Sequence, residues 1–354
     1  MKNLKKNNGS RSNVAAPLAS LSSMDLTQPI DIQEVMGAVA EHGDLLVPLD
    51  MLDAGEVLRY ASAYPGVTNS LTLGRVTNGA VSSQYNGVFI GRTAAGKVVP
   101  RTLTVYPIKI EEADEPERYR RSYITEVRGG LWEAQHPFTV WLVRHVIALA
   151  SKDLLEVLFT AKYDANISPN TNRPINVCFD GWATITEDEK TAGNIAVAKG
   201  NMFATGALTA QNIGDQLLAM WRSRPETFRR KKSQLWLSPD LFDLYTDWYE
   251  TKFTYVAGIG DEEPHPVFLR GTDGKVELRK AYGLPAGSQW TLLTTRENMI
   301  YGFDNEDDMR RVQPFNSGNP YWFTMAGKYV FGTQFISIDG SEFCINDQPL
   351  TPNP

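Results

Sequence analysis

Residues 137–160 read PFTVWLVRHVIALASKDLLEVLFT and carry the strongest helical pattern in the chain. Apolar residues recur every three or four positions, which predicts a helix with a broad buried face. The face and its flanks comprise Val140, Trp141, Leu142, Val143, Val146, Ile147, Leu149, Ala150, Leu154, Val157 and Leu158. About 24 residues of helix would measure about 36 Å, longer than the average helix of a globular domain. We expect it to serve as a backbone on which other elements pack.

Length and composition exclude several classes of protein. The chain has 354 residues and is 42% hydrophobic, enough to bury a large core and to form two or three domains. A formal net charge of −6 argues against a surface devoted to nucleic acid. No stretch approaches the roughly 20 apolar residues of a membrane span. Cys178 and Cys344 are too few for a disulfide framework or a zinc cluster, which fits synthesis in a reducing compartment.

The segment before the long helix is predicted to be an arm followed by extended chain. Residues 14–21 are apolar but contain Pro17, so the basic N-terminus is interpreted as a mobile arm rather than a signal peptide. A short helix is expected at Asp31–His42. A strand at Leu71–Val76 should turn at Asn78-Gly79 into another strand, since this dipeptide favours hairpin turns. Arg101–Ile110 is expected to be an edge strand because Pro107 cannot donate to a ladder. Such a polar hairpin should lean on another element, or on another subunit.

A mixed α/β body is predicted after the long helix. The loop Tyr163–Pro174 should end that helix. Thr209 can cap a helix that runs to Ser223, and Ser238-Pro239 can start a helix that runs to Thr251. Strands are expected at Gln234–Leu237, Trp290–Thr294, Met299–Phe303, Trp322–Phe335 and Phe343–Ile345.

The sequence carries no pattern for catalysis, cofactor binding or metal binding. None of His42, His136, His145 and His265 lies within four residues of another, so there is no helical ligand pair. His145 is interpreted as a packing or surface residue of the long helix, and Cys178 as an inert residue in an apolar stretch. There is no Gly-x-Ser-x-Gly elbow and no phosphate-binding loop. We therefore predict no catalytic, cofactor or metal residues.

Three charged runs are candidates for contacts. Arg229–Lys232 is usually a solvated corner, with a phosphate contact or a salt bridge as the alternatives. Residues 111–121 read EEADEPERYRR and change sign midway, a pattern that a repeated interface would use to set its register. Asp261-Glu262-Glu263 is most simply a solvated loop.

Several short motifs in a fixed order resemble the major capsid proteins of tailed bacteriophages. The C-terminal motifs are the most informative, and the likeness extends over about Thr68 to Asp347. The motifs are Phe179–Trp182, Leu237–Asp240, Glu297–Asp304, Tyr321–Met325 and Gly332–Phe335. Each motif is weak alone, and their order carries the resemblance.

The resemblance implies an α+β fold of the Hong Kong 97 type, also called the Johnson fold. It implies an N-terminal arm at 1–67 and an extended β-hairpin loop at 68–112 that reaches over an adjacent subunit. A peripheral domain would occupy 113–175, with the spine helix at 137–160. An axial domain would occupy 176–292, and residues 293–354 would return to the peripheral domain.

The resemblance also implies a structural role without enzymatic activity. The subunit would assemble into hexamers and pentamers of an icosahedral virion capsid that encloses double-stranded DNA, after synthesis in the bacterial cytoplasm. Its partners would be other copies, a portal, decoration proteins, and DNA bound without sequence specificity. The basic arm would contact DNA or scaffold, or be a solvated tail. The residues expected at contacts between subunits are Arg92, Lys97, Arg101, Glu117, Arg118, Arg120 and Arg121, with Asp261, Glu262 and Glu263 in an axial loop.

Two departures from the family and two alternatives accompany this interpretation. Little sequence precedes the extended loop, so we expect the scaffold to be a separate protein. Lys97 lies near the loop tip, but no asparagine can be matched to it, so we expect no covalent cross-link. An encapsulin-like cargo shell is the alternative within the fold. A soluble hydrolase that uses the eight tryptophans is the alternative from another class.

Deletion of residues 1 to about 25 tests the interpretation of the N-terminus. These residues offer no periodic apolar face, so the truncated subunit should stay soluble and keep its melting temperature. Circular dichroism melts of the two chains would check this. A sharp fall in melting temperature would mean that the segment is docked in the core.

Overall fold

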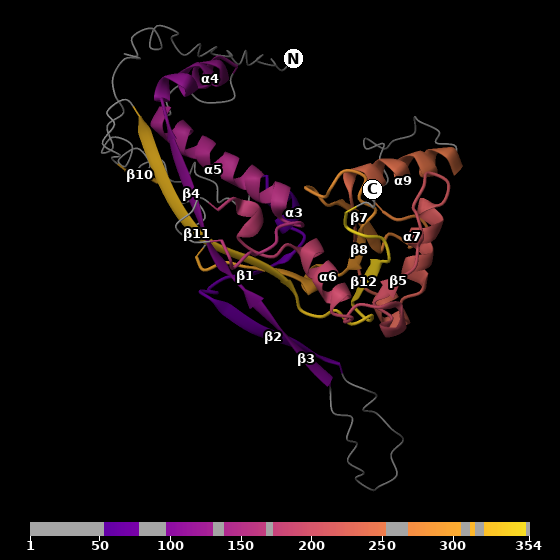
Figure 1. The fold of residues 1–354 in the computed structure, drawn as a ribbon. Helices are drawn as coiled ribbons and strands as arrows, with labels where there is room; N and C mark the ends of the chain where they lie inside the picture. Colours follow the sequence, from indigo (N-terminus) through magenta and orange to yellow (C-terminus); the bar gives the residue numbers. More distant parts are fainter. Residues whose placement is uncertain are drawn as a thin grey trace, which may run out of the picture. The chain divides into compact units, whose positions relative to one another are not determined.

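The computed structural model describes residues 53–77, 97–129, 138–167, 173–252, 268–305, 312–315 and 322–351. They fall into two units, the first with residues 111–146 and 313–326 and the second with 47–110, 147–312 and 327–354. Helices and strands are mixed in both (Figure 1), as the α+β prediction requires. The predicted helix at Asp31–His42 and the loop at 258–266 lie outside the described residues.

The described residues form both short and long helices and strands. The helices are α3 (Gly55–Leu58), α4 (Pro116–Gly129), α5 (Phe138–Val157), α6 (Trp182–Thr191), α7 (Ile213–Arg222), α8 (Glu226–Arg229) and α9 (Pro239–Lys252). The strands are β1 (Ser62–Tyr64), β2 (Ser70–Thr77), β3 (Lys97–Thr104), β4 (Tyr106–Asp114), β5 (Met202–Phe203), β6 (Ser233–Leu237), β7 (Val276–Lys280), β8 (Thr291–Thr294), β9 (Met299–Gly302), β10 (Val312–Pro314), β11 (Phe323–Phe335) and β12 (Phe343–Asn346).

A mixed five-stranded sheet in the order β5-β12-β8-β6-β7 lies in the second unit. β6 runs parallel to β7 and antiparallel to β8, and β12 runs antiparallel to β8. Helices α7 and α9 cover it through a buried cluster that includes Leu217, Leu235, Leu293 and Trp248. A Cβ at Gly214 would lie 2.3 Å from the Trp248 ring, so α7 needs glycine where α9 crosses it.

Helix α9 begins as its sequence predicts, whereas α7 begins later. The Leu241 amide donates to the Ser238 hydroxyl at 3.2 Å, and Pro239 is the first helical residue. Helix α7 was predicted from Thr209 but starts at Ile213. The amide of Thr209 donates to the Asn212 side chain at 2.8 Å, so residues 209–212 form a turn ahead of the helix.

The predicted long helix is confirmed as α5, 20 residues and about 30 Å long. It ends at Val157 rather than Thr160, because the amides of Thr160 and Ala161 both donate to the Val157 carbonyl in a closing turn. In the second unit, Ile147, Leu154 and the following Leu158 are at most 1% exposed. The Ser151 hydroxyl accepts from the Ala54 amide at 2.9 Å, which fixes the start of α3 against this helix.

Strands β2 and β3 form a separate two-stranded ribbon (Figure 1). They pair antiparallel from Ser70↔Thr104 to Thr77↔Lys97, so the prediction that residues 71–76 pair with the strand directly after Asn78-Gly79 is wrong. The predicted turn itself lies outside the described residues. The single strand predicted at Arg101–Ile110 is wrong: it is divided between β3 and β4. Val105 lies between them, where the chain changes its pairing partner from β2 to β11, and its amide still donates to the Asn69 carbonyl at 2.9 Å in the register of β2 and β3.

A second sheet in this unit contains β1, β9 and the C-terminal part of β11. β1 runs parallel to β9, and β11 runs antiparallel to β9 from Gly332↔Gly302 to Phe335↔Met299. β4 pairs with β11, its only partner among the described strands, as expected of an edge strand that contains Pro107. The domain boundary predicted at 292/293 falls within the first sheet. β8 spans this boundary, and β12, from the C-terminal segment, pairs with β8.

In the first unit, α4 is a helix that the sequence interpretation missed. In the sequence, its charged start predicts only a strip of charges of both signs. Tyr123 is 2% exposed and packs on Phe138 and Trp141, with ring centroids 5.4 and 5.9 Å away. Glu126 accepts from the Trp141 indole at 2.7 Å. His145 stacks on Trp141 at 5.1 Å, the packing role predicted for it.

Leu154→Ala tests the burial of α5. The side chain is 0% exposed, so truncation should cost about 2–5 kcal/mol of unfolding free energy. Leu149→Ala on the same helix is the matched control, because Leu149 is 41% exposed and should change stability little. Denaturant melts of both variants would check this, and equal losses would contradict the orientation of the helix.

Candidate functional site

The feature with functional potential in the second unit is the β2–β3 arm, residues 70–77 and 97–104. Its inner end belongs to the core: Leu103 is 0% exposed and clusters with Val67, Val105 and Ile300. A Cβ on Gly302 would lie 2.8 Å from a Leu103 methyl carbon, so β9 makes room for that residue. The arm is therefore built onto the sheet at one end by apolar packing.

Arg101 holds the next part of the arm. Its side chain is 10% exposed and forms an ion pair with Glu189 at 2.8 Å. It also donates to the Gln334 side chain at 2.9 Å and to the Phe335 carbonyl at 3.1 Å. Gln334 in turn donates to the Thr102 carbonyl at 3.1 Å. The role predicted for Arg101 between subunits stays a prediction, but the guanidinium already has three acceptors in its own chain.

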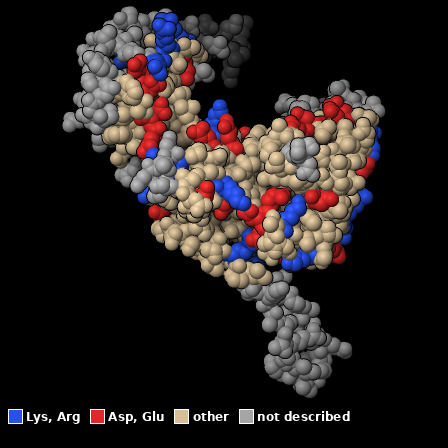
Figure 2. All heavy atoms as spheres, viewed as in Figure 1, with Lys and Arg blue, Asp and Glu red and all other residues tan. Residues whose placement is uncertain are grey.

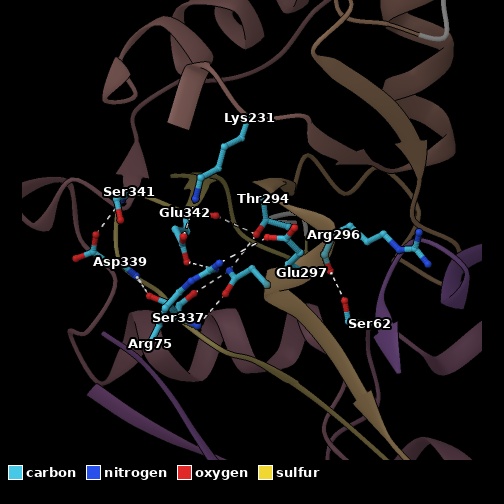
Figure 3. A network of polar contacts seen from close by, with 11 residues as sticks. Ser62, Arg75, Lys231, Thr294, Arg296, Glu297, Ser337, Asp339, Ser341 and Glu342 are labelled. Atoms are coloured by element: carbon cyan, nitrogen blue, oxygen red, sulfur yellow. Dashed lines mark hydrogen bonds and ion pairs between the residues drawn. The ribbon is translucent and has the colours of Figure 1, made fainter. Parts of the chain in front are cut away.

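Arg75 attaches the outer part of the arm to the rest of the second unit, which we call the body, through two carboxylates (Figure 3). It forms an ion pair with Glu342 and lies 3.5 Å from a Glu297 oxygen. Lys231 approaches the other oxygen of Glu342 from the opposite side, at 3.0 Å. The Glu342 side chain is 9% exposed, whereas those of Arg75 and Lys231 are 35% and 43% exposed. One buried carboxylate thus receives two partly exposed cations.

The backbone around Glu342 is fixed by a turn and by β8. The Glu342 amide donates to the Asp339 carbonyl at 2.9 Å, and the Asp339 side chain accepts from Ser341 at 2.9 Å. The Glu342 carbonyl accepts from the Thr294 hydroxyl at 3.1 Å. Asn298 donates to that hydroxyl at 3.0 Å, which extends the network from the end of β8 to the residue before β9. The carboxylate is therefore presented from a rigid base.

The two-signed run in the first unit forms local pairs where β4 meets α4. Arg118 lies 3.1 Å from Asp114 and 3.7 Å from Glu115. The Glu115 amide donates to the Asp114 carboxylate at 2.7 Å, and this hydrogen bond is the main cause that lowers the pKa of Asp114. The Tyr119 hydroxyl donates to Glu112 and Asp114, and burial followed by these carboxylates raises its pKa.

The other predicted contact residues are partly placed. Arg120 lies 5.5 Å from the centre of the Phe138 ring, and Arg121 is exposed. Their roles between subunits stay predictions. Those outside the described residues, or whose side chains are not described, are Arg92, Lys97, Glu117, Asp261, Glu262 and Glu263.

The basic run Arg229–Lys232 makes contacts within the chain. Lys231 pairs with Glu342, Arg230 pairs with Glu226, and Arg229 lies 5.9 Å from the centre of the Trp221 ring. The salt-bridge alternative for this run is therefore present in the folded chain. On the face drawn in Figure 2, the described acidic and basic side chains of the second unit are interspersed.

The cysteines and other potential ligands offer little chemistry in the described residues. No group of three or more His, Cys, Asp or Glu side chains there could hold a metal ion. Burial raises the pKa of Cys344 to about 12, so its thiol stays protonated near neutral pH. Cys178 was expected to be core but is only half-buried. In the same part of the chain, no helix is long and apolar enough to cross a membrane.

Sequence reasoning missed most of the arm's polar attachment. The sequence marks Lys231 only as part of a basic run, and Arg75 only as part of a predicted strand. Nothing in the local sequence marks Glu342, because its importance depends on a turn that brings it beside β2. The signal that was available is a charged residue in each of two separately predicted strands, Arg75 in 71–76 and Arg101 in 101–110.

Comparison with solved structures shows what fold this is. A chain of the satellite phage P4 procapsid structure, which includes the size determination (Sid) protein, superposes with a TM-score of 0.53. The identity is 11%, over 95% of this chain and 96% of that one. A chain of the capsid of an empty GTA particle gives a TM-score of 0.51 at 10% identity, over 83% and 90%. The capsid of the native GTA particle gives 0.51 at 10% identity, over 82% and 95%.

These likenesses extend over most of each chain, so the protein shares the fold of these capsid structures, as the sequence resemblance implied. A scan against models of protein families finds no match. A search of curated proteins finds none either.

Arg101→Met tests the inner attachment of the arm. It would leave the Glu189 carboxylate, the Gln334 amide oxygen and the Phe335 carbonyl without their shared donor, at a cost of about 2–4 kcal/mol. Arg230→Met removes an exposed pair with Glu226 and should cost about 0.5 kcal/mol or less. Urea unfolding would compare the two, and a silent Arg101→Met would contradict this attachment.

Proposed function

We propose that this protein is the structural subunit of a closed shell, the major capsid protein of a tailed bacteriophage. The observation that carries the proposal is the capsid fold extending over nearly the whole chain. The subunit would form hexamers and pentamers and, from them, an icosahedral shell around double-stranded DNA. It would do so without catalysis, and its place of action would be the virion after synthesis in the host cytoplasm.

The arm supports assembly because it presents apolar surface away from its own core. Val99 on β3 is 54% exposed, and the neighbouring Pro100 is exposed as well. A lone two-stranded ribbon is marginally stable in water unless it packs against something. In our proposal the arm is the extended loop, and its outer part packs on an adjacent copy.

The remaining elements have assigned roles in this proposal. Helix α5 is the spine helix, the sheet with β6 is the centre of the axial domain, and the first unit is part of the peripheral domain. Arg118, Arg120 and Arg121 contribute charge to a contact between copies. A scaffold protein, a portal and decoration proteins bind the shell, and DNA lies on the inner face without sequence-specific contacts.

The state of the purified protein tests this function. Size-exclusion chromatography with light scattering should show pentamers, hexamers or larger bodies, and electron microscopy should show closed shells when scaffold is supplied. A compact monomer at all concentrations with scaffold present would contradict the proposal. Nuclease-protected DNA in particles from the host would favour a phage capsid, whereas an enclosed enzyme would favour an encapsulin-like cargo shell. Turnover by a stable monomer would favour a hydrolase.

Deletion of the arm tip separates folding from assembly. Lys97 is the first residue of β3, so the deletion should cover Arg92–Gly96 and be closed with a short turn. It removes only polar, charged and small residues, so the subunit should keep nearly its normal stability but fail to complete shells. Circular dichroism melts and electron microscopy would measure the two properties. An unfolded monomer would show that the loop is an internal element of the fold.

A further inference from the structure

The two charged attachments of the arm lie on opposite sides of a weak point in its ladder. Leu73 pairs with Arg101, Gly74 with Pro100, and Arg75 with Val99. Proline has no amide to donate, and glycine has no side chain to pack on its neighbours. The Gly74↔Pro100 pair is therefore the place where the ribbon bends most easily. Arg101 holds the arm on the inner side of this pair, and Arg75 holds it on the outer side.

The two attachments differ in how easily they can open. Arg101 is 10% exposed and contacts three acceptors, so opening it would leave buried groups unpaired. Arg75 is 35% exposed, and its second partner Glu297 is 73% exposed, so water can solvate both when they separate.

Lys231 lowers the free-energy cost of separating Arg75 from Glu342. Removing one member of a buried ion pair is costly because the other charge is left without a partner. Here Lys231 remains 3.0 Å from Glu342, and that carboxylate keeps a cation after Arg75 has gone. The base of the network, formed by Asp339, Thr294 and Asn298, does not involve the arm. Nothing in that base has to break for Arg75 to leave.

We propose that the outer arm, residues 74–77 and 97–100, is a releasable strap that bends at Gly74–Pro100 and is held down by Arg75 on Glu342. Lys231 is the standby counter-ion that keeps the body intact in the released state. A carboxylate on a second copy that binds Arg75 favours release by the difference in its affinity for the two states. The strap itself belongs to the single chain and does not depend on the proposed shell function.

Distance measurements between two spin labels test the strap. The labels are placed at Val99→Cys on the outer arm and Asp247→Cys on α9, in full-length protein that also carries Cys178→Ser. Labelled chains are diluted with unlabelled ones so that only distances within a subunit contribute. The unaltered network should give one narrow distance. Arg75→Met should give at least a severalfold increase in a displaced population.

Lys231→Met is the matched control, because it removes the other cation of the same carboxylate. It should keep the narrow distance, and so should Arg75→Lys, which retains a cation on β2. Glu342→Gln should release the arm as Arg75→Met does.

The proposal is overturned if Arg75→Met keeps the narrow distance, or if Lys231→Met broadens it equally. It is also overturned if Arg75→Met unfolds the body, as seen by near-ultraviolet circular dichroism. Lys231 alone would then be insufficient to stabilise the buried Glu342 carboxylate.

Discussion

The aromatic cluster around Phe159 is the contact on which the second unit depends. Phe159 comes just after α5 and is fully buried, with its ring 5.6, 5.4 and 6.0 Å from those of Trp182, Trp236 and Trp290. Two of the indoles also donate hydrogen bonds: Trp182 to the Gln334 carbonyl at 3.2 Å, and Trp290 to the Thr186 hydroxyl at 3.0 Å. A Cβ at Gly181 would lie 2.5 Å from the Phe159 backbone, so α6 can begin there only with glycine. Phe159, two residues beyond the end of α5, thus joins that helix to α6 and to the sheet with β6, and Trp182 links the cluster to β11.

The arm depends on this body in a graded way. Its inner end shares the buried cluster of Leu103 and Ile300, its middle is held by Arg101, and its outer part is held by Arg75. Apolar burial at the inner end resists opening because the exposed surface costs about 25 cal/mol per Å². Partly exposed ion pairs, such as the one between Arg75 and Glu342, oppose opening of the arm much less. The order of these interactions along β2 and β3 lets the body stay rigid while the outer arm moves.

The parts that the sequence predicted are those whose signals are local. The apolar periodicity of 137–160 and the Ser238-Pro239 helix start are each contained in one segment. The first gives a helix at 138–157, three residues shorter at its end than predicted, and the second starts α9 as predicted. Helix α4 was missed because its charged first turn hid the spacing of Tyr119, Tyr123 and Val127. The break at Val105 could not be predicted, since it marks where the chain changes its pairing partner from β2 to β11. Glu342 was missed for the same reason, because its partners Arg75 and Lys231 are far away in sequence.

The mixed charge of the described surface is compatible with the proposed contact between copies of the chain. A net charge of −6 on 354 residues is modest, and the paired runs are self-neutralising: Arg118 with Asp114, and Arg230 with Glu226. Identical surfaces of one sign would repel each other within the Debye length of about 8 Å at physiological salt. Interspersed charges avoid this repulsion and still reject a wrong register, because a shift places like charges opposite each other. In the proposed shell, recognition of a neighbour would fall to these exposed charges and to the outer arm.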